Sequence, residues 1–240
     1  MLVVAVAFLL AGISKGVVGM GLPPIAIGIM SFALPLSDAI AIMVIPTITT
    51  NFWQAFYGGH FRPMMRRFWP LGVAAAAGVI LTGLVLGKLG SSGAVAWLGL
   101  VLVLYATIAL LAWRPRTPRA SEGWANPFIG VASGAVAGVT GIAAIPFLPY
   151  MQSLELTKDE LVQALGILFV FITLALAVAL VGQGTFDTAN VAGGVAANVP
   201  VFFGIWLGQK LRRAASPETF RKVFLIGMLA IGLHMARSFL

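Results

Sequence analysis

The sequence predicts an all-α polytopic membrane protein, and three observations lead to that fold class. Apolar residues (AVILMFWYC) make up 60% of the 240 residues, and charged residues make up 9%, whereas soluble domains carry about 25% charged residues. The mean hydropathy is +1.02. The apolar residues gather in eight long runs, of the length that a bilayer core requires. A soluble enzyme, a disordered chain and a nucleic-acid-binding domain are excluded, despite the formal net charge of +8.

The eight hydrophobic segments should be mainly helical, because backbone amides in hydrocarbon find no water to bond. Their ranges are 2–33, 38–58, 68–89, 93–113, 127–151, 160–182, 189–209 and 219–239. The first apolar stretch lacks a basic n-region and an obvious cleavage site, so we interpret it as part of the first membrane segment rather than as a signal peptide. Most Lys and Arg residues lie in the gaps between segments, as juxtamembrane basic residues do.

The first and fifth segments share a glycine pattern that indicates an internal duplication. A shift of 122 residues places Gly12, Gly16, Gly19 and Pro24 on Gly134, Gly138, Gly141 and Pro146. A second match, at a shift of 121, places Gly83 and Gly87 on Gly204 and Gly208. We infer two homologous halves of about four hydrophobic segments each, 1–113 and 127–240, joined by a polar linker at 114–126. Under the alternative, the glycines recur by chance and only let helices pack closely.

The distribution of basic residues constrains the topology. They fall in the connection between the second and third segments, in the linker and in the connection between the seventh and eighth segments: Arg62, Arg66, Arg67, Arg114, Arg116, Arg119, Lys210, Arg212, Arg213, Arg221 and Lys222. All three regions should be cytoplasmic, but eight plain crossings put the last one on the opposite face. The conflict disappears if the fifth segment re-enters as two half-helices of about ten residues, meeting at 138–141. If the first segment is broken in the same way, the halves are inverted repeats; eight plain crossings remain the alternative.

The two breaks are the first candidate binding elements. A broken helix exposes N-terminal amides that favour an anion, and glycine permits a close approach of the backbone. The break residues that we expect to contact a substrate near the bilayer midplane are Gly16, Gly19, Gly21, Gly138, Thr140 and Gly141. Lys15 lies in the same apolar run, where an ionised side chain costs about 2.5–3.5 kcal/mol. We predict that it supplies positive charge to the substrate; alternatively, its helix ends near Gly12 and Lys15 reaches the membrane interface. The matching position in the second half is Ala137.

Polar residues in two further segments complete the candidate site. Pro46 should kink the second segment, and polar residues that share a helix face follow it: Thr47, Thr50, Asn51 and Gln54. They are predicted to donate hydrogen bonds to the oxygens of an anion, or alternatively to bond neighbouring helices. Asn198, beside Pro200 in the seventh segment, either lines the pathway or serves packing.

The duplicated Gly-x-x-Gly-x-Gly…Pro pattern, with the motif Ile45-Pro-Thr-Ile-Thr-Thr-Asn-Phe-Trp-Gln54 and the following Gly58-Gly59, resembles the sulfite exporter TauE/SafE family, also called the 4-toluenesulfonate uptake permeases. The resemblance covers essentially the whole chain. It implies a transporter of sulfur-containing anions, which in this family often moves its substrate out of the cell. The chain departs from the family's pattern at Gly21-Leu22-Pro23, where the family often has a run of glycines, and at Ala143-Ala144.

The function that we predict is export of sulfur-containing anions, such as sulfite or organosulfonates, across the bacterial inner (plasma) membrane. An anion channel built from the same helix ends, or a carrier of another small organic anion, is the alternative. We expect no enzyme, no catalytic or metal site and no cofactor, because the chain has no Cys and only two His. The expected partners are a small anionic substrate and the lipid bilayer, without nucleic acid, and a homodimer is a possible assembly. No carboxylate lies deep in an apolar run, so the membrane potential, worth about 2.3 kcal/mol per charge per 100 mV, is the expected driving force for an exported anion.

Overall fold

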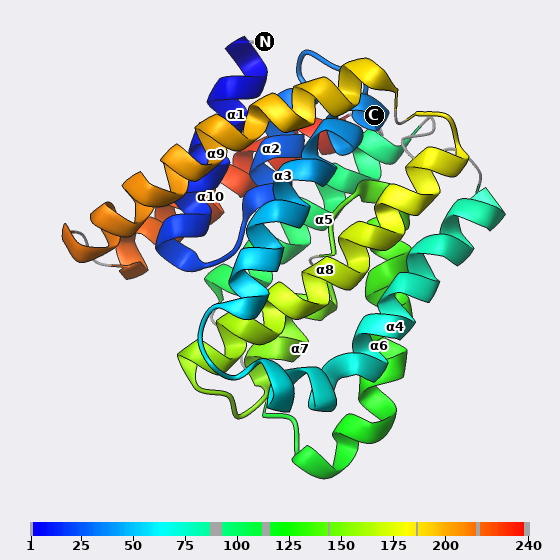
Figure 1. The fold of residues 1–240 in the computed structure, drawn as a ribbon, viewed down its shortest axis with the longest axis vertical. Coiled ribbons are helices and arrows are strands. Elements are labelled where there is room, and N and C mark those ends of the chain that lie inside the picture. Colours follow the sequence, from blue (N-terminus) through cyan, green and yellow to red (C-terminus); the bar gives the residue numbers. More distant parts are fainter. Residues whose placement is uncertain are drawn as a thin grey trace.

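The computed structural model describes residues 2–86, 93–111, 116–143, 145–185, 187–214 and 217–237, and every regular element within these ranges is helical (Figure 1). In chain order the elements are α1 (Leu2–Val18), α2 (Leu22–Met30), α3 (Leu36–Phe56), α4 (Phe61–Leu86), α5 (Ala94–Leu110), the 3-10 turn η1 (Arg119–Ser121), α6 (Glu122–Thr140), α7 (Phe147–Ser153), α8 (Lys158–Gly182), α9 (Thr188–Ala214) and α10 (Pro217–Ala236). These helices follow the eight predicted segments, with the first and fifth segments each divided in two.

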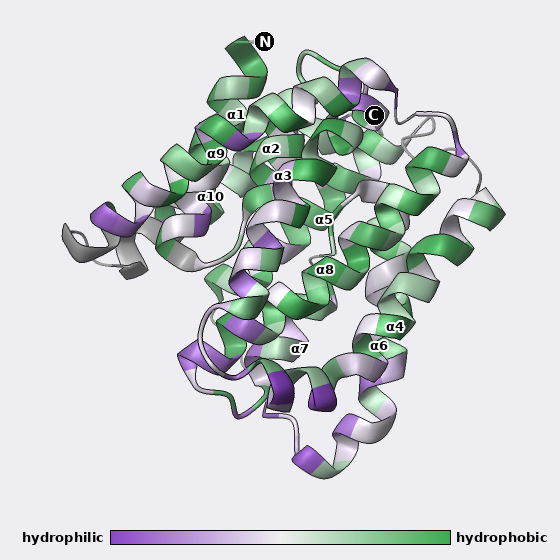
Figure 2. Cartoon of the chain, in the orientation of Figure 1, coloured by the Kyte–Doolittle hydropathy of each residue, from purple (hydrophilic) through white to green (hydrophobic). Residues whose placement is uncertain are grey.

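Four of the described helices are long and apolar enough to cross a membrane: Leu36–Phe56, Phe61–Val85, Lys158–Gly182 and Thr188–Leu211. Shorter apolar helices cover Leu2–Val17, Ala94–Leu110 and Leu225–Ala236. Large apolar side chains face outward along the long helices; Leu84 is 77% exposed and Val199 is 75% exposed. Figure 2 shows that hydrophobic residues make up most of the length of these helices. Such exposure is unfavourable in water and is expected in lipid. The predicted all-α polytopic membrane fold is confirmed.

Glycine and proline residues set both helix breaks. Gly19 and Gly21 have φ of 82° and 99°, a backbone conformation that side chains disfavour, and α2 then begins with two prolines in its first turn, where a missing N–H is tolerated. In the fifth segment Gly141 ends α6 with φ 76°. The break therefore lies within the predicted range 138–141. The predicted equal lengths of about ten residues are wrong: α6 has 19 residues and α7 has 7.

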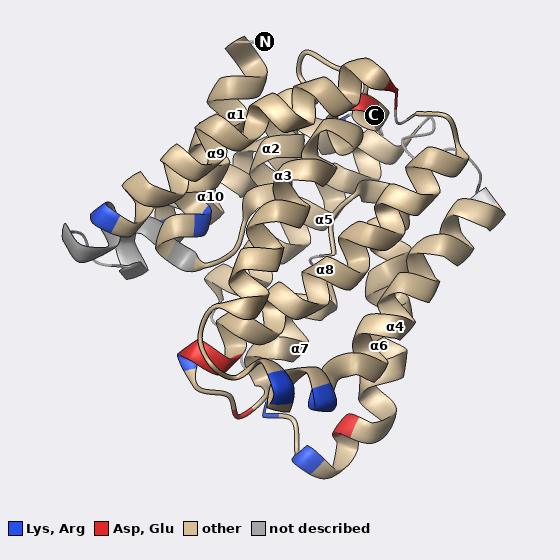
Figure 3. Ribbon diagram, viewed as in Figure 1, with Lys and Arg blue, Asp and Glu red and all other residues tan. Residues whose placement is uncertain are grey.

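The residues that precede α6 and the residues that end α7 lie side by side. Thr117, just before α6, donates its backbone N–H to the carbonyl oxygen of Ser153 at the end of α7 (3.1 Å), and the two hydroxyl oxygens are 2.6 Å apart. The Tyr150 hydroxyl donates to Asn126 Oδ1 at 2.6 Å. The chain therefore enters through α6 and returns through α7 toward the linker. A fifth segment that re-enters in this way is what the distribution of basic residues predicted. Figure 3 shows Lys and Arg concentrated at the lower and left edges of the molecule.

Helices of one half pack against helices of the other. α1 packs along α9 and α6 along α4, while α3 packs along α8 and α5 along α10. Exchanging α1 with α6, α3 with α8, α4 with α9 and α5 with α10 reproduces the same set of contacts. In Figure 1 α1 begins at the top of the view and α6 at the bottom. Matched contacts with opposite directions are what an inverted repeat requires; the residue boundaries of the two halves remain a prediction.

Glycines bring the paired helices into close contact. A Cβ placed on Gly12 would lie 3.1 Å from the Cα of Gly204, and a Cβ placed on Gly78 would lie 3.1 Å from the Cα of Gly134. Because Gly134 is the counterpart of Gly12, Gly78 is the counterpart of Gly204. The predicted match of Gly83 with Gly204 is therefore wrong in three dimensions, and its partner Gly87 lies outside the described residues.

Gly134→Ala should lower the thermal stability of the purified protein. The new methyl group would lie 2.8 Å from the carbonyl carbon of Ala75, and overpacking of this kind costs about 1–3 kcal/mol. Gly123→Ala is the matched control, because Gly123 lies on the same helix with nothing within 4 Å of its Cβ position. Thermal unfolding in detergent should separate the two variants; equal melting temperatures would show that α6 and α4 do not depend on this contact.

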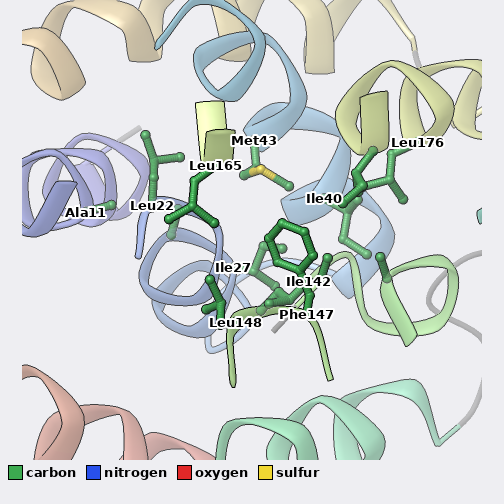
Figure 4. Packing of buried hydrophobic residues seen from close by; sticks show 14 of the residues in the cluster. Ala11, Leu22, Ile27, Ile40, Met43, Ile142, Phe147, Leu148, Leu165 and Leu176 are labelled. Atoms are coloured by element: carbon green, nitrogen blue, oxygen red, sulfur yellow. The ribbon is translucent and has the colours of Figure 1, made fainter. Parts of the chain in front are cut away.

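The packed core surrounds both breaks. Figure 4 shows Leu22 and Ile27 of α2, Ile40 and Met43 of α3, and Ile142 of the second break among its members, together with Phe147, Leu148, Leu165 and Leu176. Phe147, Leu22 and Ile40 are at most 1% exposed. The short helices α2 and α7 are therefore held by buried apolar side chains, which fixes the breaks relative to α3 and α8.

Candidate functional site

The core of the candidate site is Lys15, in the last turn of α1. Its side chain is buried, at 8% exposure, and its Nζ donates to Thr50 Oγ1 at 3.0 Å and to Asn51 Oδ1. The alternative in which the helix ends near Gly12 and Lys15 reaches the membrane interface is wrong, because α1 continues to Val18. The structure thus brings together three residues that the sequence selected from two separate segments.

The ammonium of Lys15 has no carboxylate partner within the described residues. The ion pair found within the described residues joins Arg67 and Glu122, with N and O 2.6 Å apart, and does not involve Lys15. Lys15 is instead held by two neutral oxygens. A buried cation without a counter-ion is unfavourable, and an anion bound beside it would offset that cost.

Hydrogen-bond donors remain free beside the ammonium. Asn51 Nδ2 is buried and has no hydrogen-bond partner, while Lys15 has three N–H groups and uses two of them within the described residues. The Thr50 hydroxyl donates to the Pro46 carbonyl oxygen at 2.7 Å, which leaves its oxygen to accept from Lys15. The cluster therefore presents positive charge and unpaired N–H groups together.

A small pocket lies between the two helix breaks. Met20 and Gly21 line it from the first break, and Gly141, Ile142 and Ala143 line it from the second. Its remaining walls include Met43 and Thr47 of α3, Tyr105 of α5, and Phe169, Ile172, Thr173 and Leu176 of α8. Thr47 precedes Asn51 by one turn on the same face of α3, so the Lys15 cluster and this mostly apolar pocket share one helix face.

Two predicted glycines face neighbouring helices. A Cβ on Gly16 would lie 3.0 Å from the Cα of Gly208 on α9, and a Cβ on Gly138 would lie 2.7 Å from the Cβ of Thr82 on α4. Neither glycine lines the pocket. These contacts match the packing explanation of Gly-x-x-x-Gly spacing, and a direct substrate contact for these two residues remains a prediction.

Three other predicted residues bond protein groups. Gln54 Nε2 donates to the carbonyl oxygens of Gly19 (3.3 Å) and Val162 (2.7 Å). The Thr140 hydroxyl donates to the Val136 carbonyl oxygen at 2.8 Å, at the end of its own helix. Asn198 Oδ1 accepts from the Thr49 hydroxyl at 2.6 Å, between α3 and α9. For these residues the interhelical or local alternative describes the observed contacts, and substrate binding by them stays untested.

Sequence reasoning missed three residues near the site. Thr173 lines the pocket, and the shift of 122 that relates the halves places it on Asn51, so the duplication itself could have indicated it. Tyr105 lines the pocket from α5. An aromatic residue within an apolar segment does not by itself indicate a binding role. Gln163 is 1% exposed, and an amide in the first turns of an apolar helix resembles an interfacial residue until its partners are seen.

The fold and the site define a class of protein: a multi-pass membrane transport protein with two helix breaks and a buried lysine just before the first of them. The model of the family described as sulfite exporter TauE/SafE matches residues 4–235. The chain belongs to this family of membrane transporters. No curated protein and no solved structure matched the chain.

Proposed function

We propose that this protein exports small anions with a sulfite or sulfonate head group and binds that group at Lys15 and Asn51. The observation that carries the proposal is the buried Lys15 ammonium, which lacks a carboxylate partner among the described residues. An anionic substrate supplies the missing charge, and family membership supports sulfur-containing anions as the substrate class.

The donor set suits an oxyanion. A sulfonate or sulfite head offers three oxygens, and charge-assisted hydrogen bonds from an ammonium are about twice as strong as neutral ones. The free Asn51 Nδ2 adds a second donor beside the ammonium. The pocket between the breaks, with Met43, Phe169 and Leu176 among its walls, offers apolar contact to an organic substituent, which supports organosulfonates alongside sulfite.

Outward movement follows from charge. An anion that leaves a negative-inside bacterial cell across the plasma membrane gains about 2.3 kcal/mol per charge per 100 mV. Lys15 pairs with no described carboxylate that could carry a proton in exchange. We therefore favour facilitated or weakly coupled export by a carrier, with an anion channel as the alternative mechanism.

Ligand-induced stabilisation of the purified protein tests the substrate class. Sulfite, thiosulfate and sulfoacetate should raise the melting temperature increasingly with their concentration, whereas acetate and the zwitterion taurine should raise it less. Counterflow of a labelled ligand in proteoliposomes then separates a carrier from a channel. A panel in which acetate stabilises as strongly as the sulfur anions would remove the sulfonate assignment, and flux without counterflow would favour the channel.

A further inference from the structure

Two glutamines form a reciprocal clasp where α3 ends and α8 begins. Gln54 Nε2 on α3 donates to the carbonyl oxygen of Val162 on α8, and Gln163 Nε2 on α8 donates to the carbonyl oxygen of Ala55 on α3, both at 2.7 Å. Each glutamine thus bonds the backbone beside the other. Gly166 brings the helices close enough for this, since a Cβ there would lie 2.7 Å from the Ala55 nitrogen.

The clasp also holds the first break and the start of α4. Gln54 Nε2 donates to the Gly19 carbonyl oxygen at 3.3 Å, and Gln163 Oε1 accepts from the His60 backbone N–H at 2.6 Å. Gln54 follows Asn51 by one turn toward the end of α3. The clasp therefore lies between the Lys15 cluster and the loops that precede α4 and α8, on the face where Arg62 and Lys158 are exposed.

The first break and the clasp share helical turns with the Lys15 cluster. The Gly19 backbone N–H donates to the Lys15 carbonyl oxygen at 2.8 Å, so the turn that carries the ammonium also carries the carbonyl that Gln54 holds. On α3, Asn51 and Gln54 lie on one helical turn. A displacement of either turn changes the Lys15 cluster and the clasp together.

The duplication provides an internal comparison at the opposite face. The shift of 122 places Gln54 on Leu176 and Gln163 on Ala41. Gly141, the counterpart of Gly19, would place a Cβ 2.8 Å from Ile40 Cγ1, as Gly19 would place one 3.3 Å from Val162 Cγ2. The packing is thus repeated at both faces, but only the first has side-chain amides at these positions; the second has apolar side chains.

We propose that Gln54 and Gln163 are the positioning residues of a gate that closes the path between the Lys15 cluster and the face with the basic loops. Directional hydrogen bonds to backbone carbonyls hold this gate shut, whereas at its counterpart the described neighbours of Gly141 are the apolar side chains of Ile27 and Ile40. The two gates should therefore open at different free-energy cost when access alternates around the site. The substrate role of the Lys15 cluster rests on the proposed function; the closure of the path does not.

Thiol accessibility tests the gate directly, because the chain contains no cysteine. Met43→Cys places a single reporter on the wall of the pocket, and a membrane-impermeant methanethiosulfonate reagent is applied to vesicles of each orientation. Gln54→Leu and Gln163→Leu, separately and together, should speed labelling from the basic-loop face about tenfold, the factor that one net hydrogen bond contributes. Labelling from the opposite face should not change. Gln209→Leu, at an exposed glutamine on α9, is the matched control and should leave both rates unchanged.

Two results would overturn the gate. Unchanged labelling in all three glutamine variants would show that the clasp does not close the path. An equal rise from both faces would show general loosening of the helices rather than opening of one gate. The measurement uses no substrate, so it separates the two proposals: if Lys15 proves irrelevant to anion affinity while labelling rises from one face, the gate stands and the substrate assignment falls.

Discussion

Lys15→Met should weaken the binding of sulfite or sulfoacetate about 10- to 100-fold, the range expected for the loss of a hydrogen bond from a charged group. The ligand-induced rise in melting temperature should be much smaller than that of the unsubstituted protein at the same ligand concentration. Without ligand, the stability of the variant should change little, because removal of a buried charge without a counter-ion offsets the loss of the hydrogen bonds to Thr50 and Asn51. Thermal-shift titration measures both quantities in one experiment.

Lys158→Met is the control for charge alone. Lys158 is exposed in the first turn of α8, so its replacement changes the net charge equally and should leave the affinity unaltered. A purely structural Lys15 would give the opposite pattern in Lys15→Met, with a lower melting temperature in the absence of ligand and an unchanged affinity. That pattern would remove Lys15 from the substrate site.

Gly141→Ala should abolish most of the transport activity. The alanine would have to adopt φ near 76°, which costs about 1–2 kcal/mol for a residue with a side chain. Its methyl group would also lie 2.8 Å from Ile40 Cγ1 and 3.0 Å from Ile27 Cδ1. Both isoleucines are fully buried and cannot move aside, so overpacking adds about 1–3 kcal/mol. The second break should shift away from α2 and α3 and deform the pocket, as initial rates of uptake into proteoliposomes would report.

Gly184→Ala separates the two contributions. Gly184 also has a positive φ, at 67°, but nothing lies within 4 Å of its Cβ position. This variant therefore carries the backbone strain without the clash and should retain transport. If Gly141→Ala transports as well as Gly184→Ala, the close packing of the second break is not needed for function.

The strongest sequence signals came from residues that conflict with their surroundings. Lys15 stood out because a charge in an apolar run is costly, and the structure places it with Thr50 and Asn51. Glycine beside proline located both breaks to within a few residues, because these residue types act through the backbone locally. Local chemistry of this kind can be predicted without knowledge of the tertiary fold.

The remaining features depend on which helices meet. Gly138 and Gly141 look alike in sequence, but one packs on α4 and the other ends α6, so the position of the break could not be fixed in advance. The match of Gly83 with Gly204 failed because equal spacing along the chain does not identify equal contacts. Gln54 appeared to be a substrate donor, and only the position of α8 shows that its amide already bonds two carbonyl oxygens.

The exchange of partners between the halves also governs how the protein is made. α1 leaves the ribosome well before its long partner α9, which begins only at Thr188. During translation the glycine face of α1 remains unpacked in the bilayer until its partner α9 has been synthesised. Domains that fold on their own assemble in order of synthesis, whereas here neither half can complete its packing before the other is inserted. A nascent chain stalled before α9 is therefore a natural substrate for membrane chaperones and quality-control proteases.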